Sequence, residues 1–162
     1  YAREFVQGIA GLEQSTGIAF AVENMYPWRA TQKRSLEVYQ PGRDPSAHDY
    51  AHATVDLSHA AVAHEDPIAL AQRLGSRLRH VHLADGTGSA KDEHLIPGRG
   101  NQPVAEFLQH LAGVGFDGHV VVEVNTRKSA TVDQRTDDLA EALDFARTHL
   151  RLGSRGSAET GE

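Results

Sequence analysis

The chain has 162 residues, of which 40% are hydrophobic, and this is enough for one core and therefore for one domain. Its formal net charge of −6 argues against a standing nucleic-acid or acidic-membrane surface, and without cysteine any metal must be held by carboxylate and imidazole groups. No apolar run approaches the ~18 residues of a membrane span and no signal peptide is visible, so a cytoplasmic protein is predicted.

The first third of the chain is predicted to hold one helix, one strand and a long loop. Residues 1–16 place Phe5, Ile9 and Leu12 at helical spacing, and Gly17 suits the left-handed position after a helix. The near-continuous apolar run Ile18–Glu23 (IAFAVE) is typical of a strand with both faces buried. The prolines and glycine of residues 26–52 then indicate a loop with one short helix at most.

Three further strand-like runs follow, and each leads towards a helix. The pair Asp66-Pro67 supplies an N-cap and a first-turn proline for a helix that stops at Gly75, and Pro103 starts the next helix after a glycine-rich loop. The strand-like runs are Ala53–His59 (ATVDLSH), Leu78–Asp85 (LRHVHLAD) and His119–Glu123 (HVVVE), and the last helix is expected over about 133–151.

This order of elements predicts a parallel α/β domain of the (β/α)8 TIM-barrel type, of which only about the last four β/α units are present. A complete barrel needs typically ~250 residues. We therefore expect residues 1–151 to be the C-terminal half of such a barrel and the small, polar residues 152–162 to be a disordered tail. The start at Tyr1, inside a helix-like stretch, suggests a piece of a longer protein. A missing N-terminal half, or pairing with another copy, would cover the exposed strand edges.

Each strand-like run ends in, or continues into, a side chain that binds divalent metals, namely Glu23, Asp56, His82 and Glu123. Because polar residues at the carboxyl ends of parallel strands gather at one end of the fold, we expect these four to meet. Their O,O,O,N ligand set suits Mn²⁺, Mg²⁺, Co²⁺ or Zn²⁺. A metal held in this way polarises a carbonyl or hydroxyl oxygen, while two carboxylates take and return a proton at the neighbouring carbon. This is the chemistry of aldose–ketose isomerisation or epimerisation through an enediolate.

Simpler roles are open for some of these residues. Glu23 alone would also fit an exposed strand end, and Asp56 a turn cap. His80 and His82 alternate along one strand and therefore point to the same face. His82, nearer the carboxyl end, is the expected ligand, whereas His80 is expected to be a structural histidine bonded to a backbone carbonyl.

Loop residues supply further candidates. Asp92 and His94, in the segment AKDEHLIPGRG, are a second possible metal-binding pair or part of a solvated charged loop. Lys91 and Arg99 are candidates for contact with an anionic group such as a phosphate, or are merely solvated. Trp28, in the loop after Glu23, is a candidate for capping a substrate or for packing.

These motifs resemble the xylose-isomerase-like barrel proteins, a superfamily of sugar phosphate isomerases and epimerases that also includes endonuclease IV. The resemblance is carried by the segments AVENMYPW, VDLSHA, HVHLADG with DEHLIPGRG, and VVVEVN. They cover about residues 18–125, in the order found in the family and with helices of the expected size between them.

The resemblance implies that Glu23, Asp56, His82 and Glu123 bind one divalent metal and that the two glutamates also act as the acid/base pair. His59 takes a position that serves substrate contact or a second metal. The implied activity is metal-dependent isomerisation or epimerisation of a small sugar, polyol or sugar phosphate.

Two alternatives accompany this expectation. In endonuclease IV, residues matching Asp92 and His94 bind a further zinc, which implies a zinc phosphodiesterase acting on abasic DNA. The acidic balance and the lack of a dense basic surface argue against DNA as a partner. The other alternative is an inactive, truncated half-barrel that acts only by pairing as a homo-oligomer. A small sugar is the expected partner, without nucleic acid or membrane.

Overall fold

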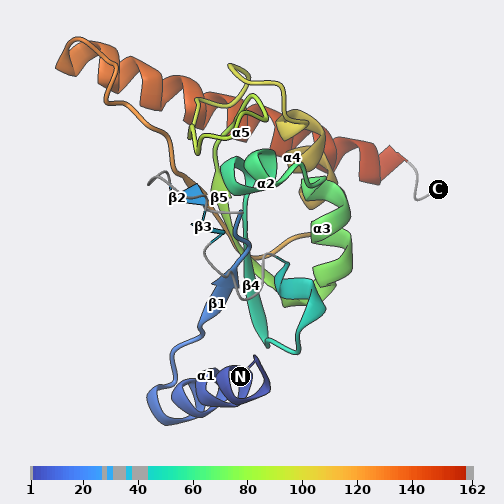
Figure 1. Cartoon of the computed structure of the whole chain (residues 1–162). Coiled ribbons are helices and arrows are strands. Elements are labelled where there is room, and N and C mark those ends of the chain that lie inside the picture. Colours follow the sequence, from blue (N-terminus) through green and yellow to red (C-terminus); the bar gives the residue numbers. More distant parts are fainter. Residues whose placement is uncertain (1, 27–28, 31–35, 38–43, 160–162) are drawn as a thin grey trace.

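Four strands form one parallel sheet, and their carboxyl ends lie along the same edge. The computed structural model describes residues 2–26, 29–30, 36–37 and 44–159. Helical segments separate most successive strands of this sheet, so the described chain is a four-unit portion of a (β/α)8 barrel, as predicted. The strands run in the order β1 (Ala21–Glu23), β4 (His52–Asp56), β5 (Leu78–Leu83) and β6 (His119–Val122), each parallel to its neighbour (Figure 1).

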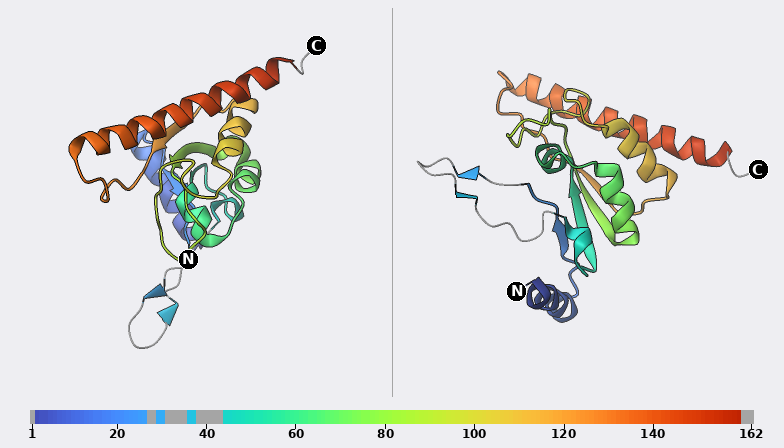
Figure 2. Two further views of the ribbon diagram at one scale, coloured as in Figure 1. Left: turned by 90° about the horizontal axis from the view of Figure 1, so that it is seen from above. Right: turned by 45° about the vertical axis from the view of Figure 1, so that its right-hand side comes forward.

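The helices gather mainly on one face of this sheet. In Figures 1 and 2, α3, α4 and α5 lie on the same side and α5 runs along α4, whereas α1 lies apart, beyond the amino end of β1. A small antiparallel pair, β2 (Arg29–Ala30) and β3 (Leu36–Glu37), occupies part of the predicted long loop. The helical segments are α1 (Ala2–Thr16), η1 (Pro45–Ala47), α2 (Leu57–Ala63), α3 (Pro67–Leu74), η2 (Gly75–Arg77), α4 (Val104–Gly113) and α5 (Val132–Glu159).

The hydrophobic core lies between the sheet and these helices. Val55, Val81 and Leu83 point from the central strands towards the helices and are fully buried. Phe107 and Leu108 of α4 meet them and are also fully buried. Each such side chain stabilises the fold by about 1.5–3 kcal/mol relative to an exposed one, so these few contacts hold the strands in place.

The opposite face of the sheet is polar and partly open. His80 and His82 alternate with the buried residues of β5 and are only partly covered. On β6, Val121 is 44% exposed. Within the described chain, β1 and β6 each have one strand partner in this sheet. In a closed barrel, further strands would pair with these two edges and cover this face.

Three predicted boundaries differ from the structure. Strand β1 begins at Ala21 rather than Ile18, and Ile18 is 59% exposed, so the expectation of two buried faces is wrong there. Strand β4 ends at Asp56 and the chain turns directly into α2, because the Asp56 carboxylate accepts the backbone N–H of His59 and caps the helix. Helix α5 does not end near residue 151 but continues to Glu159, through most of the predicted tail.

Candidate metal centre

The four predicted ligands come together at the carboxyl edge of the sheet. Glu23 ends β1, Asp56 ends β4, His82 is the penultimate residue of β5, and Glu123 follows β6 directly. The Nδ1 atom of His82 lies 2.8 Å from Glu23 Oε1 and 2.9 Å from Glu123 Oε2. It also lies 3.4 Å from Asp56 Oδ2. One imidazole nitrogen therefore faces three carboxylates from three strands.

Asn24 holds the ends of β1 and β4 together. Its side-chain oxygen accepts the backbone N–H of Asp56 at 2.7 Å, and its side-chain nitrogen donates to the Asp56 carbonyl at 3.1 Å. Its own backbone N–H donates to the Thr54 carbonyl. Asn24 is almost fully buried, so these bonds form out of water and set the positions of the carboxylates of Glu23 and Asp56. Sequence reasoning did not identify Asn24.

The charges of the cluster support one another. Burial alone would raise the pKa of Glu23, but hydrogen bonds and charge interactions with His59 and His82 outweigh it and lower that pKa. The nearby Asp56 carboxylate, followed by Glu23, raises the pKa of His82 to about 9 despite partial burial. Burial alone would lower the pKa of His59, but its bond with Glu23 and the charge of Asp56 raise that pKa to about 9. At neutral pH both imidazoles are therefore protonated among the carboxylates.

This geometry fits a divalent cation. Glu23, Asp56 and His82 each offer one ligand atom, and these atoms all lie within 4.8 Å of one another. Asp56 Oδ2 is buried and has no hydrogen-bond partner in the described chain. An unsatisfied buried acceptor costs about 1–3 kcal/mol. A cation that replaced the imidazole proton of His82 could bind this oxygen and would remove that cost. Carboxylate and imidazole donors suit Mg²⁺, Mn²⁺, Co²⁺ or Zn²⁺.

A second group of polar side chains adjoins the first. His94 Nε2 lies 3.1 Å from Asp92 Oδ1, and His59 Nε2 lies 3.6 Å from Asp92 Oδ2. The hydroxyl of Ser58 donates to Asp92 at 2.6 Å and accepts the backbone N–H of His94 at 3.0 Å. The hydroxyl of Tyr26 reaches Asp92 at 3.5 Å. Ligand atoms of Asp56, His59 and His94 also fall within 4.8 Å of one another.

The loop that carries this second group is organised by Asp85, a residue that sequence reasoning did not select. Its carboxylate is almost fully buried and accepts backbone N–H groups at four positions of the loop. Its backbone also exchanges two 2.8 Å bonds with Leu95, which closes the loop across its base. The accepted N–H groups belong to Gly86 (2.8 Å), Gly98 (2.9 Å), Gly100 (3.0 Å) and Gln102 (3.1 Å).

Arg99 has partners outside the cluster. Arg99 donates to Glu141 at 2.9 and 2.5 Å and to Asp138 at 2.9 Å, so it ties the loop to α5. Lys91 is exposed on the loop, and Trp28 lies outside the described residues. His80 was expected to bond a backbone carbonyl, but its ring lies against His82, with 5.1 Å between centroids.

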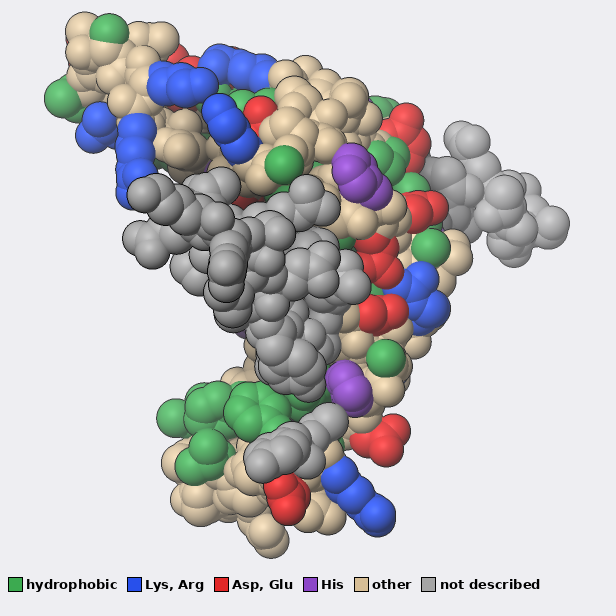
Figure 3. All heavy atoms as spheres, viewed as in Figure 1, with side chains coloured by type: hydrophobic (Ala, Val, Ile, Leu, Met, Phe, Trp, Pro, Cys, Tyr) green, Lys and Arg blue, Asp and Glu red, His purple; other side chains and the backbone are tan. Residues whose placement is uncertain are grey.

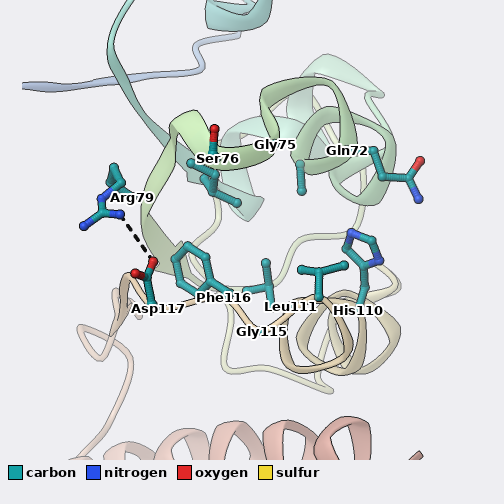
Figure 4. Close-up of a pocket in the computed structure, with 12 residues that line it drawn as sticks. Gln72, Gly75, Ser76, Arg79, His110, Leu111, Gly115, Phe116 and Asp117 are labelled. Atoms are coloured by element: carbon teal, nitrogen blue, oxygen red, sulfur yellow. Dashed lines mark hydrogen bonds and ion pairs between the residues drawn. The ribbon is translucent and has the colours of Figure 1, made fainter. Parts of the chain in front are cut away.

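Among the hollows of the described chain, the one that borders the site residues is smaller than one at the opposite edge of the sheet. A hollow of about 450 Å³ borders Glu123, His94 and Asp92 at the carboxyl edge. A larger one, of about 610 Å³, lies at the amino ends of β5 and β6, between α3 and α4 (Figure 4). Arg79 and Asp117 pair across its rim at 3.3 Å. None of the predicted ligands lines the larger hollow, so we assign the site to the carboxyl edge.

Known proteins are similar to this chain in sequence, and two of the three that follow match it over most of its length. An uncharacterized protein of Mycobacterium tuberculosis is 45% identical over 168 residues, covering 93% of this chain and 60% of that protein. The D-psicose 3-epimerase of Ruminiclostridium cellulolyticum is 30% identical over 133 residues, covering 80% of this chain and 42% of the enzyme. The fructoselysine 3-epimerase of Escherichia coli O157:H7 is 36% identical over 72 residues, which are 44% of this chain and 26% of the enzyme. The chain thus spans about 60% of the length of the mycobacterial relative.

Structural comparison agrees on the fold. The crystal structure of a D-tagatose 3-epimerase-like protein superposes with a TM-score of 0.60 at 24% identity, covering 88% of this chain and 53% of that one. No helix in the described chain is both long and apolar enough to cross a membrane. Residues 1–149 match the sequence profile of the xylose isomerase-like TIM barrel. The chain therefore belongs to the xylose isomerase-like TIM-barrel family.

Proposed function

We propose that this chain carries the metal centre and the acid/base pair of a divalent-metal-dependent isomerase or epimerase of a small sugar, polyol or sugar phosphate. The observation that carries the proposal is the approach of Glu23 and Glu123, from the two outer strands of the sheet, to one nitrogen of His82 at 2.8 and 2.9 Å. The epimerases among the relatives support the same reaction class.

Glu23, Asp56, His82 and Glu123 would hold the metal. When bound, a divalent cation supplies polarisation of a carbonyl or hydroxyl oxygen and so acidifies the neighbouring C–H bond. Asp56 is fully buried and its carboxylate caps the start of α2. This fixed position suits a metal ligand rather than a group that transfers protons.

The two glutamates suit the proton transfers. One carboxylate takes the proton from the carbon next to the carbonyl, which leaves an enediolate of the substrate. The other returns a proton to the opposite face for epimerisation, or to the neighbouring carbon for isomerisation. Glu123 is partly exposed at the hollow and can reach a substrate there. His59, 3.3 Å from Glu23, would orient that carboxylate or bind a substrate hydroxyl.

The test is solvent exchange of the substrate's α-proton. The protein with Mn²⁺ is incubated in D₂O with D-psicose or D-tagatose, and deuterium uptake is measured by mass spectrometry. We expect uptake with the native chain, loss of at least about 100-fold with Glu123→Gln, and little change with Glu106→Gln, an exposed glutamate on α4. Undiminished exchange in Glu123→Gln would contradict the assignment.

The second polar group favours one further candidate. Asp56, His59 and His94 can share an additional cation, with Asp92 beside them, and a multinuclear zinc phosphodiesterase acting on abasic DNA would need such ions. Metal analysis separates the candidates. Two or three tightly bound zinc ions per chain, with nicking of abasic duplex DNA, would favour the phosphodiesterase, whereas one exchangeable cation and no nicking would favour the sugar enzyme.

A further inference from the structure

The hollow beside the metal centre is lined by two carboxylates, Asp92 and Glu123, by His94 and by one arginine, Arg127. Arg127 belongs to the segment that continues from Glu123 after β6. The remaining lining residues are Val124, Asn125 and Thr126 of the same segment.

Local hydrogen bonds hold the backbone of this segment against the site. The backbone N–H of Asn125 donates to the His94 carbonyl at 2.7 Å, and the Asn125 side chain accepts the N–H of Arg127 at 3.0 Å. Further along, the Ser129 hydroxyl donates to Asp138 of α5 at 2.6 Å. The backbone at Arg127 is therefore held in place by hydrogen bonds, and its side chain is exposed.

Among the arginines that the structure describes, Arg127 borders the hollow and has a free guanidinium charge. Arg73, Arg79 and Arg99 each form ion pairs with carboxylates, whereas no ion pair of Arg127 occurs among the residues that the structure describes. Lys and Arg side chains also gather over the loop before α5 and the first turns of that helix (Figure 3). A positive charge that borders the hollow and is not already neutralised is available to a ligand.

We propose that Arg127 binds an anionic group, a phosphate or a carboxylate, at the end of the substrate remote from the reacting carbons. The identity of the ligand as a sugar substrate rests on the proposed function, whereas anion binding by Arg127 does not. Asp92 and Glu123 would repel an anion placed next to them, so the anion is favoured beside Arg127, where the neighbouring Asn125 and Thr126 offer neutral polar groups. A guanidinium suits either anion because it donates two parallel hydrogen bonds. The preferred substrate is therefore a sugar with a terminal acid, which should bind better than a neutral sugar.

The first experiment measures anion binding without turnover. After removal of metal with EDTA and dialysis, the affinities for inorganic phosphate and for acetate are measured by calorimetry for the native chain, Arg127→Met and Lys128→Met. Lys128 is the matched control, because it has the same charge, is the next residue and does not line the hollow. We expect at least one anion to bind, Arg127→Met to weaken it about tenfold or more, and Lys128→Met to change it less than twofold.

The second experiment distinguishes a phosphate from a carboxylate as the anionic group of the substrate. Deuterium exchange with Mn²⁺ is compared for D-fructose, D-fructose 6-phosphate and D-fructuronate, which share the reacting end. A higher kcat/KM for one charged sugar, lost in Arg127→Met through KM, supports the proposal and names the anion. Absence of anion binding, equal losses in the two variants, or a native preference for D-fructose that Arg127→Met leaves unchanged would each overturn it. Anion binding without exchange of any sugar would instead leave the Arg127 site standing and defeat the proposed reaction.

Discussion

Asp56 Oδ2 lies 3.4 Å from His82 Nδ1, buried and without a hydrogen-bond partner in the described chain, while Oδ1 of the same carboxylate caps α2 through the N–H of His59. One oxygen therefore serves the fold and the other faces the proposed metal. This division lets the two roles of Asp56 be measured separately.

Asp56→Asn should lose metal and keep the fold. An Asn side-chain oxygen still accepts the His59 N–H, but the atom in place of Oδ2 becomes a neutral donor. Because changes outside the immediate ligands cost about 10–100-fold in metal affinity, loss of a ligand should cost at least about 100-fold for Mn²⁺ by calorimetry. Asp66→Asn is the control, since Asp66 caps α3 through Ile68 and Ala69 away from the site. Unchanged Mn²⁺ affinity in Asp56→Asn would remove Asp56 from the ligand set.

The raised pKa values of His59 and His82 predict opposite pH trends for the metal-free and metal-bound protein. Both values are about 9, above the ordinary 6.5, so the protonated forms stabilise the metal-free fold fully below pH 6.5, and this contribution is lost as the pH rises through 9. Thermal unfolding of the metal-free protein should therefore occur at lower temperature at pH 9 than at pH 6.5. In His82→Gln this decline should be smaller.

Metal binding should release protons over the same range. A ligand imidazole must be neutral, so a cation displaces the proton of His82, and affinity for Mn²⁺ should rise between pH 6.5 and 9. Calorimetry in buffers of different ionisation enthalpy measures the protons released. A binding constant independent of pH would mean that His82 is not a ligand.

The sequence predicts that Glu23, Asp56, His82 and Glu123 meet, because each lies at or towards the carboxyl end of a strand-like run. Parallel strands bring such positions to one edge. Asn24 and Asp85 could not be found in this way, because their roles depend on partners distant in the chain: Asn24 bonds Asp56 32 residues away, and Asp85 bonds Gln102 17 residues away. The ion pairs of Arg99 could not be predicted for the same reason. Nothing in a loop motif shows that Glu141, 42 residues later, lies beside it.

Element boundaries and the burial of single residues were also not predictable from the sequence. An apolar run does not say which of its residues are paired, so the exposed Ile18 was counted in β1. The capping bond of Asp56 converts a strand-like run into a helix start at Leu57, a local competition that β propensity alone does not resolve.

Asp85→Asn should destabilise the fold and loosen the loop over the second polar group. Asn can accept with its single oxygen but presents N–H groups to the remaining backbone donors of the loop. Hydrogen bonds to a charged group contribute about 1.5–3 kcal/mol each, so we expect a loss of about 2–4 kcal/mol in the free energy of unfolding by urea denaturation. Asp117→Asn is the control. Its carboxylate is 79% exposed and pairs only with Arg79 in the described chain, and exposed pairs contribute about 0–1 kcal/mol.

Threonine substitutions at Val81 and Val121 should distinguish the covered face of the sheet from the open one. The two residues lie on neighbouring strands and differ in exposure, since Val81 is fully buried and Val121 is 44% exposed. At Val81 the new hydroxyl enters an apolar core beside Leu83 and should lower the free energy of unfolding by about 1–3 kcal/mol. At Val121 the hydroxyl meets water and the change should stay within about 0.5 kcal/mol. A large loss at both positions, measured by urea denaturation of this chain, would mean that the open face is covered in solution, with Val121 in the covering contact.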